Sequence, residues 1–247
     1  MWYYHSLYKE FANTSRTWLD SDTAERWQHN VKNRPQDLGR LGWTEHNVCY
    51  DFNSQGFRSP EFADQPTVMF VGCSNTCGIG LPPWAIWPTL VAAELRLRCA
   101  NLGQGGTSSD TAFRLTVGWI DAIKPRILIF LQPPGIRWEL LHGQSDNGGI
   151  AHFIAGMLVR PRMPAMKERF RDYMTLYSHD DSNRVLNETK NRLAMELLCL
   201  RRRVKFLHMP DLCIIEDDWA RDLYHAGVRS HAAFAKTVLQ ALHSDHS

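Results

Sequence analysis

A serine and a distant Asp-His pair have the residue types that nucleophilic acyl transfer requires. Ser74 follows the apolar run 68–71 and Gly72, and Asp222 and His225 lie three residues apart near the C-terminus. Serine is a weak nucleophile unless a base takes its proton, and the base works best when a carboxylate orients it. A spacing of three brings Asp222 and His225 to one face of a helical turn. The pattern therefore predicts a Ser-His-Asp triad and ester cleavage.

Each of these motifs also has a structural explanation when it is taken alone. Gly-x-Ser arises by chance in many chains, and an Asp-x-x-His pair more often caps a helix or lies on the surface. The context favours catalysis, because residues 67–71 read as a buried strand and Gly72 permits a sharp turn after it. In open α/β sheets, ligands bind at the carboxyl ends of the strands, where Ser74 is expected.

Three stretches of the chain resemble the sequence blocks of one enzyme family. Residues 68–95 (VMFVGCSNTCGIGLPPWAIWPTLVAAEL) resemble the first block of the SGNH (GDSL-like) hydrolases, with a hydrophobic strand, Gly-x-Ser, and a helix opened by Trp-Pro. Residues 101–106 resemble the second block, and residues 220–235 (ARDLYHAGVRSHAAFA) resemble the last. Residues 53–58 are similar to a lead-in that often precedes the first block. The resemblance covers residues 67–132 and 204–242.

The resemblance implies a role for each matching residue. Ser74 is the nucleophile, His225 the general base and then acid, and Asp222 its orienter. The backbone N–H groups of Ser74 and Gly106 would bind the oxyanion, and a glycine at 106 allows a close approach because it has no Cβ. An ordinary loop is the alternative reading of Gly105 and its glycine neighbours. The chemistry requires no cofactor and no metal.

Two residues depart from the family pattern. Cys73 stands where an aspartate is usual, and it is itself an alternative nucleophile, because a thiol at a helix N-terminus has a lowered pKa. Ser74 is favoured because it occupies the nucleophile position. Strand 127–131 runs into Gln132 where the family has an asparagine that donates to the oxyanion. Loss of such a donor costs about a hundred- to thousandfold in rate, so Gln132 either replaces it or only caps the strand.

Apolar runs alternate with helical patterns along the chain, which predicts an α/β fold of βαβ units. We expect a single domain, a three-layer α/β/α sandwich with a mostly parallel, flavodoxin-like central sheet. The expected strands are residues 67–71, 99–102, 127–131 and 204–207, and the expected helices are residues 87–97, 109–123, 181–202 and 230–243.

Two of these helices carry a pattern that predicts which side is buried. In helix 181–202, one apolar stripe is expected to face the core, formed by Leu186, Thr189, Leu193, Leu197 and Leu200. In the last helix, Ser230 is expected to cap the start. The side chains expected to face the core there are Phe234, Val238 and Leu242.

Two regions of the chain lie outside the expected strands and helices of the sandwich. Residues 1–66 form an N-terminal extension with one expected helix at residues 23–32. Residues 136–180 form an insertion that is too long for an ordinary connection; we expect it to border the cleft as a lid or substrate wall, with a structural excursion or an oligomer contact as the alternative. Trp138 and Trp219 are candidates to stack on a glycan ring, and a packing role is the alternative.

Composition narrows the class of partner and the compartment. The chain has 247 residues and a net charge of +2, so it carries no electrostatic signature of nucleic-acid or anionic-membrane binding. Six scattered cysteines form no disulfide or zinc framework. The first residues lack a signal-peptide pattern, and no apolar run has membrane-spanning length. A cytoplasmic location is the default expectation, and export without a signal, as with a virion, remains open.

Together these observations predict a serine esterase that cleaves small O-acyl esters. Aromatic residues near the expected sheet edge favour a carbohydrate O-acetyl ester as substrate. Two alternatives remain: an O-acyltransferase on the same triad, and a catalytically weak glycan-binding module that kept the fold. The oligomeric state is not indicated by the sequence.

Overall fold

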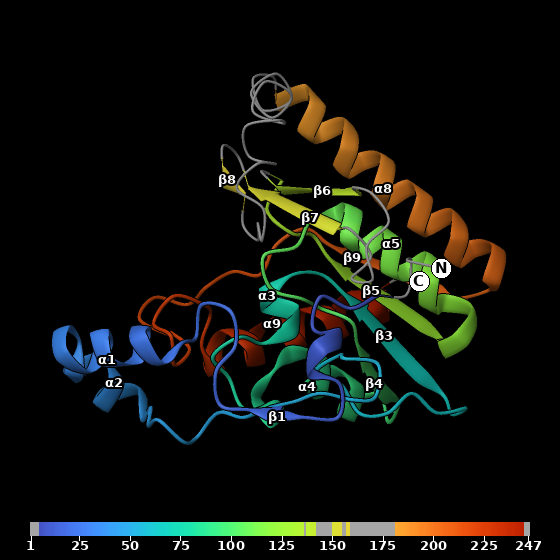
Figure 1. Ribbon diagram of the computed structural model, residues 1–247. Helices are drawn as coiled ribbons and strands as arrows, with labels where there is room; N and C mark the ends of the chain where they lie inside the picture. Colours follow the sequence, from blue (N-terminus) through green and yellow to red (C-terminus); the bar gives the residue numbers. More distant parts are fainter. Residues whose placement is uncertain (1–4, 136, 142–149, 155–156, 159–180, 245–247) are drawn as a thin grey trace.

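A four-stranded parallel sheet forms the centre of the computed structural model, which describes residues 5–135, 137–141, 150–154, 157–158 and 181–244 (Figure 1). The strand order is β4-β3-β5-β9, and all three pairings are parallel. The carboxyl ends of the strands therefore meet at one edge of the sheet. The strands are β3 (Thr67–Val71), β4 (Arg98–Asn101), β5 (Ile127–Leu131) and β9 (Lys205–Met209).

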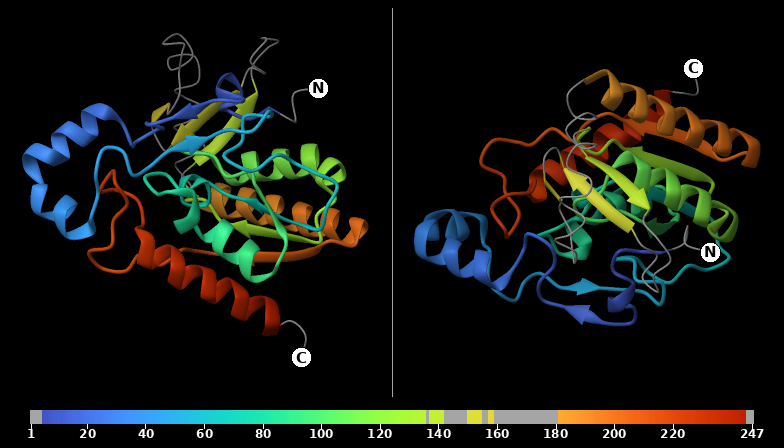
Figure 2. Two further views of the ribbon diagram at one scale, coloured as in Figure 1. Left: turned by 90° about the horizontal axis from the view of Figure 1, so that it is seen from below. Right: turned by 45° about the horizontal axis from the view of Figure 1, so that its top comes forward.

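Helices cover both faces of this sheet (Figures 1 and 2). Helices α5 (Ser109–Ile123) and α8 (Asp181–Arg202) pack on one face, and α4 (Trp87–Glu94) and α9 (Val228–Ser244) pack on the other. The predicted three-layer α/β/α sandwich is confirmed. In chain order the strands lie 2-1-3-4, so β3, the first of them, stands between β4 and β5, as in a flavodoxin-like sheet.

The alternation of side chains along β3 explains why it lies at the centre. Met69 and Val71 belong to the core on the α5 and α8 face, and Val68 and Phe70 belong to the core on the α4 and α9 face. All five residues of the strand are buried. A strand that is apolar on both faces is the pattern of a central strand in a parallel sheet.

The predicted element boundaries agree closely with the structure. Helices at residues 109–123 and 181–202 have the predicted bounds, and α1 (Ala24–Asn33) begins after Thr23, whose side chain accepts a bond from Arg26 N–H. The predicted helix 87–97 ends earlier, at Glu94. Arg96 there adopts a left-handed φ of 55°, which turns the chain into β4.

The prediction of a buried leucine stripe on α8 is wrong. Leu186 and Leu200 are 68% and 73% exposed, and the buried residues of the helix are Asn191, Met195 and Cys199. Thr189 lines a surface cavity, and Leu193 and Leu197 are about half exposed.

Polar contacts with α5 explain this rotation of α8. Asn191 Nδ2 donates to Ser109 Oγ at 3.0 Å and to Asp110 Oδ1 at 2.8 Å, and Thr116 Oγ1 donates to Met195 Sδ at 3.4 Å. A buried amide needs such partners, so Asn191 faces α5 and the leucines turn outward.

The predicted capping role of Ser230 is also wrong. Helix α9 begins earlier, at Val228, and Asp218 binds its first turn. Asp218 Oδ2 accepts the Ser230 N–H at 2.6 Å and the Ser230 hydroxyl at 2.7 Å. The predicted core residues of α9 are confirmed; Phe234, Val238 and Leu242 are all buried.

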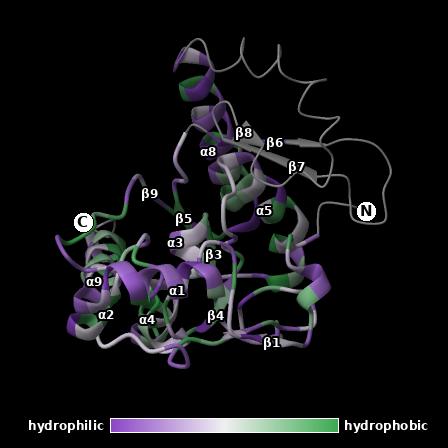
Figure 3. Ribbon diagram, turned by 60° about the vertical axis from the view of Figure 1, so that its left-hand side comes forward, coloured by the Kyte–Doolittle hydropathy of each residue, from purple (hydrophilic) through white to green (hydrophobic). Residues whose placement is uncertain are grey.

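The N-terminal region packs beside the segment that carries Asp222 and His225. It contains a 3-10 turn η2 (Lys9–Phe11), a short pairing of β1 (Ser15–Arg16) with β2 (Tyr50–Asp51), and the helices α1 and α2 (Pro35–Leu41). In Figures 1 and 2, α1 and α2 (blue) lie against the orange-red loop that precedes α9. Figure 3 shows that the outer surface of α1 is hydrophilic.

The insertion contributes a second, antiparallel sheet. Strands β6 (Arg137–Leu141), β7 (Ile150–Ile154) and β8 (Met157–Leu158) form it, and β6 packs near α5. Arg114 of α5 and Glu139 of β6 form an ion pair at 2.6 Å, and both side chains are 4% exposed. Most of the segment for which a lid was predicted lies outside the described residues.

Candidate active site

Ser74 is the first residue of a short helix at the carboxyl edge of the sheet. Helix α3 (Ser74–Cys77) follows β3 after only two residues. Gly72 has no room for a side chain, because a Cβ there would lie 2.2 Å from Thr76 Oγ1 and 2.9 Å from the Leu131 carbonyl oxygen. The close passage of the chain at Gly72 therefore fixes the strand-to-helix turn that presents Ser74.

A buried arginine holds the other end of this turn. Arg58 Nη1 donates to the Gly78 carbonyl at 2.6 Å, and Nη2 donates to the Leu81 carbonyl at 2.6 Å and to the Cys49 carbonyl at 2.9 Å. Arg58 is 4% exposed and also lies over the ring of Tyr50. The carbonyls at the end of α3 thus find their donor in the segment 53–58, which was noticed in the sequence only as a resemblance.

Asp222 and His225 form the hydrogen bond that their spacing predicts. His225 Nδ1 lies 2.7 Å from Asp222 Oδ2, while Asp222 Oδ1 accepts the backbone N–H groups of Tyr224 and His225, each at 3.1 Å. The carboxylate is 1% exposed. Burial alone would raise the pKa of Asp222, but the bonds and charge of His225 and the Ser21 hydroxyl together lower it, so the ionised carboxylate is favoured.

Ser21 is a third member of this group that sequence reasoning missed. Its hydroxyl donates to Asp222 Oδ2 at 2.8 Å and lies 3.3 Å from His225 Nδ1. Ser21 and His225 both bind the Asp222 carboxylate, although they lie 204 residues apart in the sequence. No local pattern around Ser21 signals this contact, because only the tertiary fold brings the N-terminal region to the site.

The loop that follows α3 is tied to the loop that carries Asp222. Arg221 N–H donates to the Gly80 carbonyl at 3.0 Å. Gly80 has a φ of 76°, and a Cβ there would lie 2.8 Å from Ala220 Cβ and 3.3 Å from Asp222 Oδ1. These contacts hold the predicted base and the predicted nucleophile at the same edge of the sheet.

A buried ion pair fixes the residue next to Asp222. Arg221 is fully buried, and its Nη2 donates to Asp22 Oδ2 at 2.6 Å. Asp22 also accepts the Tyr50 hydroxyl at 2.5 Å. Burial raises the pKa of Asp22, and the bonds and charge of Arg221 oppose that rise. The pair anchors the Asp-His loop to the N-terminal region.

In this conformation the predicted nucleophile, Ser74, and the predicted base, His225, are not hydrogen-bonded to each other. Ser74 Oγ has a contact with Cys73 Sγ at 3.9 Å, and no hydrogen bond among the described residues joins it to His225. Ser74 is 6% exposed. Catalytic hydrogen bonds are often long or misaligned without substrate and tighten in the complex, so this geometry is compatible with the predicted relay.

The predicted backbone oxyanion donors come from adjoining turns. Gly106 has a φ of 69°, and within the described residues its N–H meets no acceptor. The loop before it is docked on the turn that precedes Ser74, because Gln104 N–H and Thr107 Oγ1 both donate to the Gly72 carbonyl, at 3.4 and 3.3 Å. The Ser74 N–H, at the start of α3, has no acceptor within its helix.

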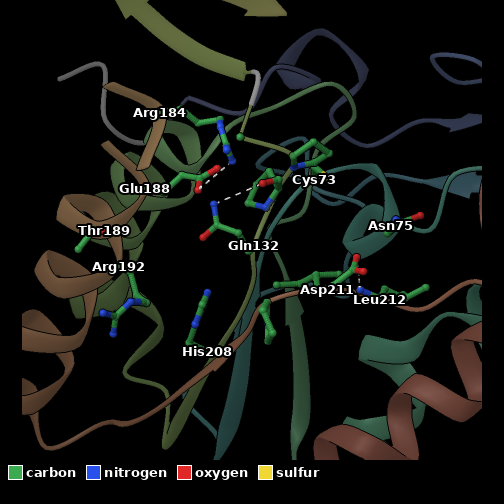
Figure 4. A pocket seen from close by; sticks show the side chains of 15 residues that line it. Cys73, Asn75, Gln132, Arg184, Glu188, Thr189, Arg192, His208, Asp211 and Leu212 are labelled. Atoms are coloured by element: carbon green, nitrogen blue, oxygen red, sulfur yellow. Dashed lines mark hydrogen bonds and ion pairs between the residues drawn. The ribbon is translucent and has the colours of Figure 1, made fainter. Parts of the chain in front are cut away.

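Gln132 lies at the end of β5, beside the turn that carries the predicted nucleophile. Its backbone N–H donates to the Met209 carbonyl at 2.8 Å, and its side-chain Nε2 is 3.3 Å from the Pro133 carbonyl. The side chain thus makes a weak local bond and also lines a cavity with Cys73 (Figure 4). Its predicted role as an oxyanion donor stays a prediction.

That cavity has a volume of about 520 Å³. Its lining comes from three sides: the start of α3, the ends of β5 and β9, and the first half of α8 (Figure 4). The α8 residues are charged or polar, and the strand ends add Gln132 and His208. A cavity of this size beside a predicted nucleophile is suited to a substrate group.

The two tryptophans predicted to stack on a glycan lie in different surroundings. Trp138 is 4% exposed, so the role predicted for it does not fit: its ring has no free face. Trp219 is partly buried, and its carbonyl accepts the Trp43 Nε1–H at 2.8 Å. The role predicted for Trp219 stays a prediction.

An aromatic ring that the sequence analysis missed lies directly beside His225. Tyr224 is 61% exposed, and its ring stands edge-on to the imidazole at 5.2 Å between centroids. The guanidinium of Arg26 lies 5.4 Å from the centre of the same ring.

No group of three His, Cys, Asp or Glu residues with the arrangement of a metal site occurs in the described part of the chain. Over the same residues, none of the helices combines the length and apolar content needed to cross a membrane.

Comparison with known proteins finds similarity only among solved structures. No family model matches the chain, and no curated protein matches it. An acetyl xylan esterase from the rumen bacterium Butyrivibrio proteoclasticus is 17% identical with a TM-score of 0.39, over 75% of this chain and 64% of that one. TesA is 13% identical with a TM-score of 0.39, over 71% and 97%.

A further similar structure is a family two carbohydrate esterase from Clostridium thermocellum in complex with cellohexaose. It is 12% identical with a TM-score of 0.35, over 75% of this chain and 66% of that one. The chain thus spans less than two thirds of the acetyl xylan esterase. At such identities and TM-scores the matches carry no argument about activity, and the function rests on the geometry described above.

Proposed function

We propose that this protein is a serine ester hydrolase of the SGNH type, with Ser74 as nucleophile, His225 as general base and Asp222 as its orienter. The observation that carries the proposal is the Asp222–His225 bond at 2.7 Å, on a loop bonded to the segment that follows Ser74. Since Nδ1 faces the carboxylate, the other imidazole nitrogen is left to act on the serine hydroxyl. Small O-acyl esters, including O-acetyl groups on carbohydrate, are the proposed substrates.

The reaction has two steps. Ser74 Oγ attacks the ester carbonyl carbon while His225 Nε2 takes the hydroxyl proton, and the ionised Asp222 stabilises the imidazolium. The N–H groups of Ser74 and Gly106 bind the oxyanion, and Gln132 is the side-chain candidate to add a third bond. His225 then returns the proton to the leaving alcohol, and water, activated by the same imidazole, hydrolyses the acyl-enzyme.

A fluorophosphonate probe tests the nucleophile directly, because it forms a covalent bond with an activated serine. We expect the wild type to be labelled once per chain and Ser74→Ala to remain unlabelled. Cys73→Ala is the matched control, since it removes the neighbouring alternative nucleophile and leaves the serine in place. Labelling that survives in Ser74→Ala but disappears in Cys73→Ala would show that the nucleophile is the Cys73 thiol and not Ser74.

A weakly catalytic binding module is the second candidate, because no hydrogen bond among the described residues joins Ser74 to His225. Unlabelled, folded wild-type protein would favour that module. An O-acyltransferase on the same triad differs from a hydrolase in its acceptor, so product analysis with p-nitrophenyl acetate and added methanol or glucose separates the two. A hydrolase releases acetate whether or not the added alcohol is present.

A further inference from the structure

The N-terminal region contacts the loop of the proposed oxyanion donor as well as the Asp-His loop. We propose that Tyr8 and Asp20 are positioning residues that hold the oxyanion loop, residues 104–106, where the Gly106 N–H can bind the oxyanion. The catalytic part of this inference rests on the proposed hydrolase function, whereas the anchoring of the loop does not depend on it.

The Tyr8 hydroxyl joins the oxyanion loop to Asp20. It accepts the Gly105 N–H at 2.7 Å and donates to Asp20 Oδ2. Because Tyr8 is only 1% exposed, water has little access to either bond. The bond from Gly105 fixes the chain one residue before the proposed donor, Gly106.

Asp20 acts on the oxyanion loop through Tyr8 and also by direct packing. A hydroxyl that donates to a carboxylate becomes a better acceptor, so the bond to Asp20 strengthens the bond from Gly105. A Cβ at Gly105 would overlap Asp20 Oδ2 and lie 2.9 Å from the Tyr8 hydroxyl oxygen. The absence of a side chain at residue 105 is therefore explained by this close approach.

Gln104 attaches the same loop to the N-terminal region at a second point. Its side chain is fully buried; Oε1 accepts the Leu7 N–H at 3.1 Å, and Nε2 donates to Ser6 Oγ at 3.1 Å. The chain just before the loop packs on α3, because a Cβ at Gly103 would lie 2.5 Å from the Cys77 backbone nitrogen. The oxyanion loop is thus held between the N-terminal region and the helix that presents the proposed nucleophile.

Asp20 and Ser21 form the tip of a tight turn. Leu19 and Asp22 flank them and exchange two backbone hydrogen bonds, at 2.9 and 3.0 Å. Asp20 adopts a left-handed φ of 53°, which is unfavourable for a residue with a side chain and is kept where the surrounding contacts require it. The two tip residues serve different parts of the site, because Asp20 supports the oxyanion loop and Ser21 binds Asp222. One turn therefore connects the proposed oxyanion donor with the proposed base.

Amide hydrogen exchange, followed by NMR on isotope-labelled protein, tests the anchoring without catalysis. Tyr8→Phe keeps the ring and removes the hydroxyl, and Asp20→Ala gives the same test if Tyr8→Phe does not fold. In both variants we expect the Gly105 amide to exchange at least about fivefold faster, with the amides of β3 unchanged. Asp217→Ala is the matched control, because Asp217 also has a left-handed φ, of 57°, and its side chain is exposed. Unchanged exchange of Gly105 in both variants would overturn the proposal.

The kinetics of p-nitrophenyl acetate hydrolysis test the catalytic part. In Tyr8→Phe and in Asp20→Ala we expect kcat to fall at least about tenfold with KM within about twofold, because the oxyanion bond is made in the transition state and not to the bound ester. Asp20→Asn keeps an oxygen acceptor and tolerates the left-handed backbone, so it should recover most of kcat. The double variant should be no slower than the slower single variant, since both changes break one chain of bonds.

The remaining outcomes separate this proposal from the hydrolase function. Faster exchange of Gly105 with an unchanged kcat would overturn the positioning role. A loss of kcat in Asp217→Ala as large as in Asp20→Ala would attribute the effect to the backbone and overturn the role of the carboxylate. Faster exchange in the variants of a wild type that fluorophosphonate does not label would support the anchoring and remove the hydrolase.

Discussion

Replacing Ser21 by alanine tests whether the carboxylate of the proposed triad needs its distant partner. The change removes the 2.8 Å bond to Asp222 Oδ2 and leaves the three bonds from Tyr224 and His225. A hydrogen bond to a charged group contributes about 1.5–3 kcal/mol, which corresponds to roughly 10- to 150-fold in rate if it is all lost in the transition state. Ser21 is partly exposed and water can replace its hydroxyl in part, so we expect a loss in kcat near the tenfold end.

The pH dependence of the variant gives a readout that a general loss of structure would not. The Ser21 bond is one of the contributions that lower the pKa of Asp222 against the effect of burial. Without it the ionised carboxylate is less favoured, so the pKa of Asp222 rises. The acid limb of kcat/KM should therefore shift to higher pH.

The assay is the hydrolysis of p-nitrophenyl acetate from about pH 3 to pH 9, with urea unfolding as a check of stability. Ser21→Thr keeps the hydroxyl and should recover most of the activity. Ser15→Ala removes a similar bond, from an exposed serine to Asp51, and should leave both kcat and the acid limb unchanged. A Ser21→Ala enzyme with kcat within twofold of the wild type and an unshifted acid limb would refute the positioning role.

Three further predictions concern stability. Burial, with the charge of His225, lowers the pKa of His231 to about 3. Below about pH 6.5 the unfolded chain therefore binds more protons than the folded one, and the unfolding free energy should fall by up to about 1.4 kcal/mol per pH unit. In His231→Gln the urea midpoint should change less between pH 7 and pH 5 than in the wild type. Asp22→Asn, which leaves Arg221 buried and unpaired, should lower the unfolding free energy by about 3–5 kcal/mol. Gly80→Ala, at a φ of 76°, should destabilise the protein by at least about 1 kcal/mol and reduce its activity. Gly39→Ala, with open space around the site, should be neutral or should stabilise the protein by up to about 1 kcal/mol. Equal urea midpoints for the two glycine variants would contradict this prediction.

The sequence predicts the sheet and its helices well because their signals are local. The central strands β3 and β5 are short apolar runs, and helices such as α5 and α8 have clear periodicity. The Asp222–His225 bond was predictable for the same reason, since both groups lie on one turn.

The parts of the site that the sequence does not predict depend on contacts between distant segments. Ser21 and Asp22 lie in the N-terminal region, outside the segments that resemble known blocks, and their partners are side chains about 200 residues along the chain. Nothing in their own surroundings distinguishes them from surface polar residues. Arg58 lies in the lead-in 53–58, but the resemblance gave no sign that its side chain binds the carbonyls after α3.

The orientation of α8 was mispredicted because two signals in the helix compete. Its leucines give the stronger hydrophobic pattern, yet Asn191 finds two partners on α5 and directs the other face inward. A buried amide with fixed partners outweighed a stripe of leucines here. Periodicity shows that a helix has two faces, but not which of them meets a polar neighbour.

The salt bridge of Asp22 with Arg221 joins groups separated by 199 residues, and this has a consequence for the order in which the protein matures on the ribosome. The turn bearing the nucleophile, together with the first strands, is synthesised well before the C-terminal loop emerges. Asp22 and Ser21 therefore have no partners until Arg221 and Asp222 have emerged. We therefore expect the proposed hydrolytic activity to appear only after residues 221–225 have been synthesised and bound to the N-terminal region, although most of the sheet can already have formed.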